Sequence, residues 1–361
     1  MSSSDEGPNI DAATAQKLVK EFEGISNTDE IFAQFMLQEN DWDLSKALNA
    51  FFADKVEKKR KLEEELRELP DVDVPGPSIE SALKEGLLTT RAPETLNVVS
   101  WNIDGLDQKN LQKRTEAVCK ILELENADIV FLQEVIPETF SYIESKLSIG
   151  YECIPGNPGD YFVATLLRRG RIYKDESRII PFPGSVMGRH LLSVSAHFGQ
   201  VKLDLLNTHL ESTKDHAEER KIQLKKSLEI MKSVGEERNV MFGGDLNMRD
   251  KELQEVGGLP PGARDCWEAC GRRKEAEFTW DISRNTNLEW PGKFKPRCRF
   301  DRIYLKPCSG FSAAPKHFGL IGLQKVSGTQ SYPSDHWGLL LKLSLNQDGN
   351  KPEEERDNNV S

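Results

Sequence analysis

The chain has 361 residues, of which 37% are hydrophobic and 30% are charged, and its formal net charge is −11. This length allows about two domains, or one large α/β domain with an appendage. No apolar run approaches the ~20 residues that cross a bilayer, and the first residues, MSSSDEGPN, lack the basic and apolar parts of a secretory signal. We therefore expect neither a membrane-spanning nor a secreted protein.

The acidic charge is concentrated at the two ends of the chain. Residues 1–94 hold 21 acidic and 11 basic residues, and residues 346–361 hold 5 and 2. The remaining segment, 95–345, holds 33 acidic and 35 basic residues. The central segment is therefore near neutral to slightly basic, and the overall charge does not exclude nucleic acid as its partner.

Residues 11–54 are predicted to form a small module of three short helices. Three segments within it place apolar residues at helical spacing, and Asp41 or Asp43 is a candidate N-cap for the third. Thr28 is a candidate N-cap for the second, although Ile31 stands where a capping box would have Glu or Gln.

Residues 55–94 read as a charged linker. Its first part, 55–70, is rich in helix formers and ends at Pro70, which indicates a solvated helix or linker. The basic run Lys58–Lys61 is alternatively a nuclear localisation signal. Residues 346–361 are polar without apolar periodicity, so we expect a disordered acidic tail.

From residue 95 to 345 the pattern changes to apolar strands alternating with helices. Strands are predicted at 96–103, 127–135, 161–169, 189–198, 201–210, 238–247, 299–305 and 337–345, with helices at 108–125, 137–147 and 215–235. This order indicates an α/β, or α+β, four-layer sandwich in which two packed mixed sheets are flanked by helices.

The six cysteines are scattered, and Cys266 and Cys270 are the one close pair. We interpret them as reduced thiols, because a zinc site would need a second close pair or nearby histidines.

Five predicted strands carry similar polar residues at one end. These motifs are SWNIDG with Asn102 and Asp104, FLQE with Glu134, NTHLES with Asn207, Thr208, His209 and Glu211, GGDLN with Asp245 and Asn247, and SDHWG with Asp335 and His336. Any one of them alone is more typical of a turn residue or helix cap. Five together form a constellation, because turns do not require a Glu inside LQE or a His directly before a core strand.

This set suits metal-assisted hydrolysis of a phosphate ester. Glu134 is a hard oxygen ligand of the kind Mg²⁺ prefers, and Asp245 can orient and deprotonate a water. Asn102 and Asn247 can bind phosphate oxygens without repelling a cation. His336 can donate to the developing charge, with Asp335 or Asp301 holding its tautomer.

In this order and spacing the five motifs resemble the endonuclease/exonuclease/phosphatase superfamily of Mg²⁺-dependent phosphoesterases, over residues 95–345. Further motifs resemble the members of that superfamily that hydrolyse 5′-tyrosyl DNA. These are WNIDGL, IIPFP, HLEST with HAEER, TWD with Asn285, Asn287 and Leu288, RFDRI, and PSDHWGLL.

The resemblance implies a 5′-tyrosyl-DNA phosphodiesterase that removes a trapped topoisomerase II tyrosine and leaves a 5′-phosphate. It implies Glu134 as the Mg²⁺ ligand, with Mn²⁺ able to substitute, and Asn102, Asp245, Asn247 and His336 as catalytic residues. Three residues, Asp104, Asp301 and Asp335, are then expected to support these. Thr208, Arg189, Tyr151 and Asn207 are expected along the phosphate and DNA path.

Two basic stretches, 166–174 and 293–302, contain interleaved aromatic residues, which suits contact with a single-stranded DNA end; ordinary solvated strand edges are the alternative. We expect Leu288, Trp290 and Phe294 to form an apolar wall against the terminal bases.

Residues 35–52 resemble a ubiquitin-associated module, which implies ubiquitin as a partner of residues 11–54; the alternative is a folding cap on the main domain. The expected location is the nucleus, with the cytoplasm as a second compartment. The rival functions are another phosphoesterase of the superfamily, such as an abasic-site endonuclease, sphingomyelinase, deadenylase or inositol phosphatase, and a ubiquitin-binding adaptor with an inert domain.

Overall fold

The computed structural model describes residues 11–26, 33–34, 36–37, 40, 42–44, 46–47, 95–159 and 161–347. The chain divides into two compact units, Met1–Leu87 and Leu88–Ser361. The predicted caps Thr28 and Asp41, the block 55–70 with its basic run, and the tail beyond residue 347 lie outside the described residues. Among the described residues, no helix is both long and apolar enough to cross a membrane.

The first unit contains helix α1, Ala12–Ser26, and short helical turns after it. The side chain of Asp11 accepts hydrogen bonds from the amide and hydroxyl of Thr14, which caps the start of the helix. A small apolar core forms from Val19, Phe22, Ala33, Leu37 and Ala47. Asp43 accepts from the Lys46 amide, as expected of a cap.

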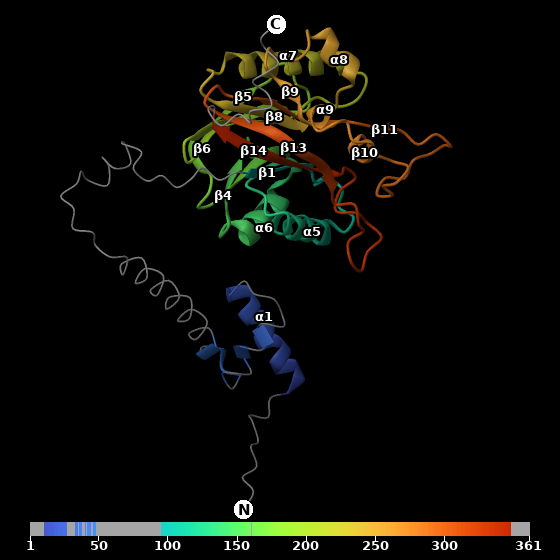
Figure 1. Cartoon of the computed structure of the whole chain (residues 1–361). Coiled ribbons are helices and arrows are strands. Elements are labelled where there is room, and N and C mark those ends of the chain that lie inside the picture. Colours follow the sequence, from blue (N-terminus) through green and yellow to red (C-terminus); the bar gives the residue numbers. More distant parts are fainter. Residues whose placement is uncertain are drawn as a thin grey trace, which may run out of the picture. The chain divides into compact units, whose positions relative to one another are not determined.

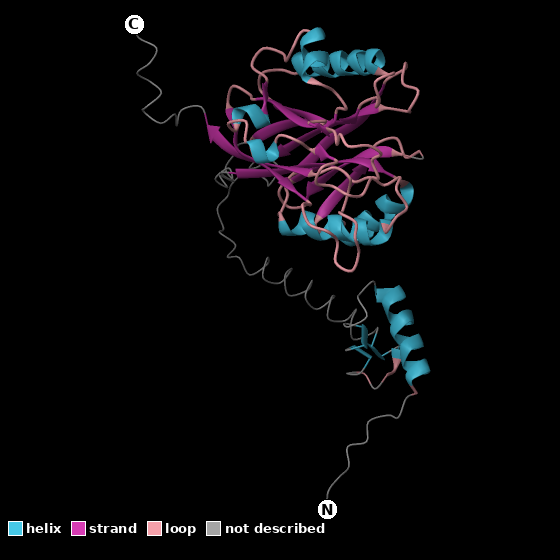
Figure 2. Ribbon diagram, turned by 90° about the vertical axis from the view of Figure 1, so that its right-hand side faces the viewer, coloured by secondary structure: helices cyan, strands magenta, loops and turns pink. Residues whose placement is uncertain are grey.

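The second unit is a sandwich of two six-stranded sheets with helices on both outer faces, as the sequence predicted (Figures 1 and 2). One sheet has the order β13-β14-β1-β2-β4-β3 and the other β5-β6-β7-β8-β12-β9, and β10 pairs with β11 separately. The first sheet contains β1 (Thr95–Asn102), β2 (Ile129–Val135), β3 (Tyr151–Pro155), β4 (Phe162–Arg168), β13 (Phe311–Ile321) and β14 (Gly338–Gln347). The second contains β5 (Tyr173–Pro181), β6 (His190–Phe198), β7 (Val201–His209), β8 (Asn239–Asp245), β9 (Arg264–Asp265) and β12 (Asp301–Lys306). The separate pair is β10 (Trp280–Asp281) and β11 (Arg297–Cys298).

The helices cover the outer faces. Figure 1 shows α5 (Leu111–Leu124) and α6 (Pro137–Leu147) on the first sheet, and α7 (Ala217–Ser233) and α8 (Asp250–Glu255) on the second. Two short helices, α9 (Cys266–Ala269) and η1 (Lys274–Ala276), follow β9.

Alternation along the strands explains the layers. Val98 and Ile129 face the core between the two sheets, whereas their neighbours Val99 and Val130 pack under α5 and α6. Because both faces are covered, the strands read as continuous apolar runs.

Three longer strands, β3, β5 and β13, were not predicted. In β5 only Ile180 is even partly covered, because this edge strand leaves its polar side chains in solvent. In β13 the ladder shifts register between Pro315 and His317, since proline cannot donate to it. Neither β5 nor β13 carries the apolar pattern that identifies a covered strand.

Candidate active site

The polar strand ends meet at one edge of the sandwich. The Asn102 amide, at the end of β1, donates to Glu134 Oε1 on β2 and to Asp245 Oδ2 at the end of β8, both at 3.0 Å. Asn102 and Asp245 are buried. One side chain from the first sheet thus joins two carboxylates from the two sheets.

The backbone around Glu134 has an unusual geometry. The β2–β4 ladder shifts register between Leu132 and Val135, and Glu134 has a φ of 53°, which an L-residue rarely adopts. The amide of Gly105 donates to Glu134 O at 3.0 Å, and a Cβ on Gly105 would lie 2.3 Å from that oxygen. Only glycine at position 105 therefore allows this approach, which fixes the direction of the Glu134 side chain.

His336 completes this cluster from the segment before β14. Its Nδ1 lies 2.8 Å from Asp301 Oδ2, which also accepts from the Thr279 hydroxyl, and its Nε2 lies 3.7 Å from Asp245 Oδ2. Burial lowers the pKa of His336, but the carboxylates of Asp301, Asp335 and Asp245 outweigh it and raise that pKa well above its ordinary value. His336 is therefore a protonated donor near neutral pH.

Ser334 explains why SDHWG precedes a core strand. Its hydroxyl donates to Asn102 O at 2.6 Å and accepts from the His336 amide at 3.1 Å. The Trp101 indole also donates to His336 O. The motif therefore binds the end of β1 and holds His336 over it.

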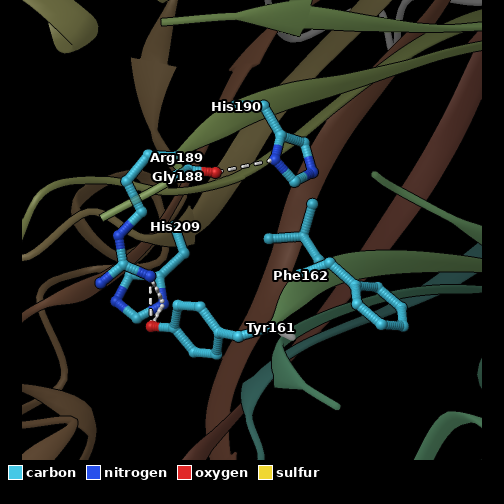
Figure 3. A pocket seen from close by; sticks show the side chains of 7 residues that line it. Tyr161, Phe162, Gly188, Arg189, His190 and His209 are labelled. Carbon is cyan, nitrogen blue, oxygen red and sulfur yellow. Dashed lines mark hydrogen bonds between the residues drawn. The ribbon is translucent and has the colours of Figure 1, made fainter. Parts of the chain in front are cut away.

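A second cationic group enters from the start of β6. The Arg189 guanidinium contacts the Tyr161 hydroxyl and lies 3.0 Å from His209 Nδ1, and it stacks over the Tyr161 ring at 4.7 Å. Figure 3 shows these three side chains converging in a small pocket. Burial and the neighbouring Arg189 lower the pKa of His209 well below its ordinary value, so this ring is neutral. Its Nε2 lies 3.3 Å from Asp245 Oδ2 and 2.8 Å from the Asn247 amide.

The carboxylates of this edge fit a divalent cation. Burial is the main cause that raises the pKa of Asp104 and Asp245, and it raises the pKa of Glu134 to about 7. Nearby carboxylates raise each of these pKa values further. Asp104 Oδ2 is buried without a hydrogen bond within the described residues, 3.5 Å from Arg114. Glu134, His209 and Asp245 each offer a ligand atom within 4.8 Å of the others. A hard cation would stabilise these crowded charges, and oxygen donors are what it prefers.

An aromatic series extends outward from His336. The Phe300 ring lies 6.5 Å from His336 and 5.6 Å from Trp280, and Trp290 meets Trp280 edge-on at 6.0 Å. The Trp280 indole donates to Asp335 Oδ2 at 3.1 Å, so Asp335 holds Trp280, whereas Asp301 holds the tautomer of His336. The predicted wall residues Leu288, Trp290 and Phe294 are all exposed.

Three other predicted residues lie elsewhere. The Thr208 hydroxyl is buried and donates to His190 O. Asn207 lies between the sheets, where its amide donates to Ala164 O. Tyr151 begins β3 opposite Arg168, at the other end of the first sheet, and its hydroxyl donates to Ala127 O. The polar groups of Thr208, Asn207 and Tyr151 thus bind protein groups, and the placement of these residues along the phosphate path stays a prediction.

The two basic stretches differ in position. The first, 166–174, lies at the end of β4 remote from the site, where Arg171 pairs with Asp128 and Lys174 with Glu152. This position and these ion pairs favour the alternative, an ordinary strand edge, over a contact with DNA.

The second stretch, 293–302, borders a cavity of about 300 Å³ that begins at Met248 and Arg249, just after Asn247. Arg297 stacks over Phe278 at 4.2 Å and pairs with Asp281. This stretch therefore combines cationic and aromatic surface next to the site.

Several site residues were not predicted from the sequence. They are Tyr161, Ser334, Trp280, Arg114 and Arg249. Ser334 lies within a singled-out motif, and Arg249 follows GGDLN by two residues, so proximity to the motifs was an available signal. Arg114 is a buried arginine on α5 whose guanidinium donates to Ile103 O and Asp104 O, and nothing in its helical pattern marks it.

Known proteins resemble both units of this chain. The Endonuclease/Exonuclease/phosphatase family matches residues 99–336, and a UBA-like domain matches residues 13–58. Tyrosyl-DNA phosphodiesterase 2 of Homo sapiens is 38% identical over 342 residues, which covers 91% of this chain and 92% of that protein.

Two solved structures are also similar. D. rerio TDP2 complexed with single strand DNA product has a TM-score of 0.66 and 41% identity, and the match covers 69% of this chain and 98% of that one. TDP2 from C. elegans has a TM-score of 0.63 and 33% identity, with 95% and 96% covered.

Proposed function

We propose, from the premise that the chain belongs to the endonuclease/exonuclease/phosphatase family, that it hydrolyses the 5′-phosphotyrosyl bond between DNA and a trapped topoisomerase II tyrosine. The products are a free tyrosine and a DNA end with a 5′-phosphate. The observation that carries the proposal is the convergence of three side chains at one edge of the sandwich: Asn102 joins Glu134 to Asp245, and His336 lies 3.7 Å from Asp245.

Water is the nucleophile in this reaction. Asp245 lies between Asn102 and His336 and is a carboxylate made more basic by burial, so it can orient the water and accept its proton. The bond from water oxygen to phosphorus forms while the bond from phosphorus to the tyrosine oxygen breaks. A phenol has a pKa near 10, so the tyrosine leaves as a phenolate without a strong general acid.

Negative charge develops on the phosphoryl oxygens, and two cationic side chains can stabilise it. The protonated His336, held by Asp301, lies on one side of Asp245, and Arg189 lies beside His209 on the other. Preorganised donors of this kind supply a large part of the barrier reduction in acyl and phosphoryl transfer.

Glu134, whose ligand atom lies within 4.8 Å of those of Asp245 and His209, would hold a divalent cation, with the Asp104 carboxylate near enough to feel the charge of Glu134. We propose that this cation is Mg²⁺, with Mn²⁺ able to replace it. When bound, the cation would neutralise charge on the phosphoryl oxygens and on the leaving oxygen.

A single-stranded DNA end suits the surface that leads away from the site. Arg249 follows the catalytic strand and is exposed, and the described part of the chain offers its guanidinium no ion pair. Trp290 and Trp280 offer faces or edges for bases beside His336. Stacking on aromatics with backbone contacts to arginine is typical of binding to single strands. D. rerio TDP2, which this chain resembles, was solved with a single strand DNA product.

We further propose that the UBA-like segment, residues 13–58, binds ubiquitin. From the basic run Lys58–Lys61 we also propose that the protein acts in the nucleus, with the cytoplasm as a second compartment. The test of binding is the retention of ubiquitin by residues 1–361, and loss of Glu134 is expected to leave it unchanged.

The activity test uses a 5′-tyrosyl oligonucleotide and an abasic duplex, each with Mg²⁺ and with chelator. We expect Mg²⁺-dependent release of tyrosine from the first substrate, and Glu134→Ala to abolish it. Glu138→Ala, an exposed glutamate on α6, is the matched control and keeps full activity.

Cleavage of the abasic strand alone would contradict the substrate proposed. If the wild type and Glu134→Ala are equally inactive on every phosphodiester tried, the result would favour the alternative of a ubiquitin-binding adaptor with an inert domain.

A further inference from the structure

Glu211 is a fully buried carboxylate that lies outside the catalytic cluster. It follows β7 within the HLEST motif and has none of its surface exposed. Four donors surround its two oxygens: the amides of Val186 and Met187 at 3.0 and 3.1 Å, the Ser185 hydroxyl at 2.7 Å, and the Gln223 amide at 2.9 Å. This carboxylate therefore binds the loop 182–189, which connects β5 to β6.

The loop ends at Arg189. The Ser185 hydroxyl, which donates to Glu211, accepts in turn from the backbone amide of Arg189 at 2.8 Å. Two bonds therefore connect the buried carboxylate to the backbone that carries the guanidinium. At the other end of the same side chain, Arg189 meets Tyr161 and lies 3.0 Å from His209 (Figure 3).

The far side of Glu211 is fixed to α7. Gln223 donates to the Glu211 carboxylate and accepts from the Glu211 amide at 2.9 Å, so the two residues bind each other reciprocally. Arg220 donates to Glu211 O and pairs with Glu252. Glu211 is thus held by a rigid helix on one side and holds the loop on the other.

The Glu211 carboxylate is charged in the folded protein. Burial alone would raise its pKa, but the hydrogen bonds from Gln223, Ser185 and the Val186 amide outweigh it and lower that pKa. Glutamine cannot replace it, because its NH₂ group would face the Gln223 NH₂ group, and two donors cannot pair.

We propose that Glu211 is a positioning residue for the hydrolysis: through Ser185 and the loop 182–189 it holds the Arg189 guanidinium beside His209. This inference rests on the proposed function for its kinetic consequence. Its structural part, the ordering of the loop by a buried anion, stands independently.

A double-mutant cycle separates positioning from simple stabilisation. On the 5′-tyrosyl oligonucleotide, Glu211→Gln and Arg189→Ala are each expected to lower kcat by about 10–100-fold, as expected for misplacement or loss of a donor to the developing charge. Since Glu211 acts through Arg189, the double variant is expected to lie within threefold of Arg189→Ala alone. If the two losses multiply instead, the proposal is overturned.

Asp128→Asn is the matched control. Asp128 is also buried and accepts a backbone amide, from Asn97 at 2.8 Å, and pairs with Arg171, but it lies at the opposite end of its sheet. We expect this variant to lower the melting temperature with kcat unchanged. If Glu211→Gln behaves in the same way, Glu211 is only a structural residue.

Two further measurements keep the test decisive. Ser185→Ala leaves the carboxylate and its three other donors in place and removes the hydroxyl that connects Glu211 to the Arg189 amide, together with a longer bond from the Met187 amide at 3.3 Å. This variant should fold and still lower kcat; wild-type kcat would overturn the proposal. Hydrogen exchange needs no turnover, and Glu211→Gln should speed exchange at the amides of Val186, Met187 and Arg189. An inactive wild type would therefore refute the proposed function, whereas unchanged exchange in the variant would refute the role of Glu211.

Discussion

Replacing Gly105 by alanine tests whether the placement of Glu134 controls activity. The added Cβ would lie 2.3 Å from Glu134 O, and real Cβ atoms stay at least 3.0 Å from their neighbours. The backbone of Glu134 must therefore retreat by about 0.7 Å or more, which also weakens the 3.0 Å hydrogen bond from the Gly105 amide. The strain falls on backbone, which cannot rotate away as a flexible side chain could.

A displacement approaching 1 Å at a reacting centre costs on the order of 10²-fold in rate. Overpacking of this kind also costs about 1–3 kcal/mol of stability, which corresponds to a fall in melting temperature of about 3–10 °C for a domain of this size. We therefore expect Gly105→Ala to lose roughly 30–100-fold in kcat on the 5′-tyrosyl oligonucleotide at saturating Mg²⁺.

The control is Gly159→Ala, where nothing lies within 4 Å of the added Cβ. Steady-state kinetics and thermal melting are measured on both variants and the wild type. If Gly105→Ala keeps kcat within threefold and melts like Gly159→Ala, the close approach to Glu134 does not fix the catalytic geometry, and the reasoning fails.

Three further predictions address the other parts of the site. Asp301→Asn removes a charge-assisted hydrogen bond of about 1.5–3 kcal/mol, so kcat should fall about 10–150-fold. Because Asp301 raises the pKa of His336, the alkaline limb of the kcat–pH profile should also move to lower pH in this variant. An unmoved limb would contradict the role of His336 as a protonated donor. Trp290→Ala removes a stacking face worth about 1–3 kcal/mol per base, so KM for a single-stranded substrate should rise about tenfold with kcat nearly constant, and an equal KM would exclude the wall. The pKa of Glu211 is lowered in the folded state, so its stabilising contribution is present above its unfolded pKa of about 4.3 and is lost as the pH falls below that value. The difference in the free energy of unfolding in urea between the wild type and Glu211→Gln should therefore be larger at pH 7 than at pH 4. A constant difference would refute the assignment of Glu211 as a buried charged carboxylate.

The layers and most of the catalytic cluster could be predicted because they follow from local pattern. Strands such as β2 and β8 are buried on both faces and therefore read as apolar runs, and their polar ends are visible as interruptions of those runs. The apolar wall of Leu288, Trp290 and Phe294, which was inferred from local composition, stays a prediction. By contrast, β5 has nothing to bury on its outer side, so its sequence carries no strand signal.

Residues that act through partners distant in the sequence were the ones that sequence reasoning could not place. Glu211 stands beside His209 in one motif, yet its side chain turns to the loop 182–189 rather than to the cluster. Asp335 and Asp301 were equal candidates for the His336 tautomer, and their contacts distinguish them: Asp301 lies 2.8 Å from His336 Nδ1, whereas Asp335 accepts from Trp280, 55 residues before it in the sequence. Such choices depend on packing between elements that no local pattern encodes.

Strand direction explains which of the predicted site residues meet at one edge of the sandwich. β1 runs parallel to β2, and β7 runs parallel to β8, so their carboxyl ends reach the same edge and the residues there, Asn102, Glu134 and Asp245, converge. β12 is antiparallel to β8, and the register pairs Asp301 with Asp245, so an antiparallel strand contributes the residue at its start. His336, just before β14, follows the same rule.

The same rule places Tyr151 at the opposite edge. β4 is antiparallel to β2, so its end, near Arg168, lies at the opposite edge, and Tyr151, which pairs with Arg168, lies there too. The residue that precedes β4, Tyr161, is the tyrosine that reaches the site. The site takes its residues from the carboxyl ends of parallel strands and the amino ends of antiparallel ones, and a sequence read without strand directions cannot distinguish Tyr151 from Tyr161.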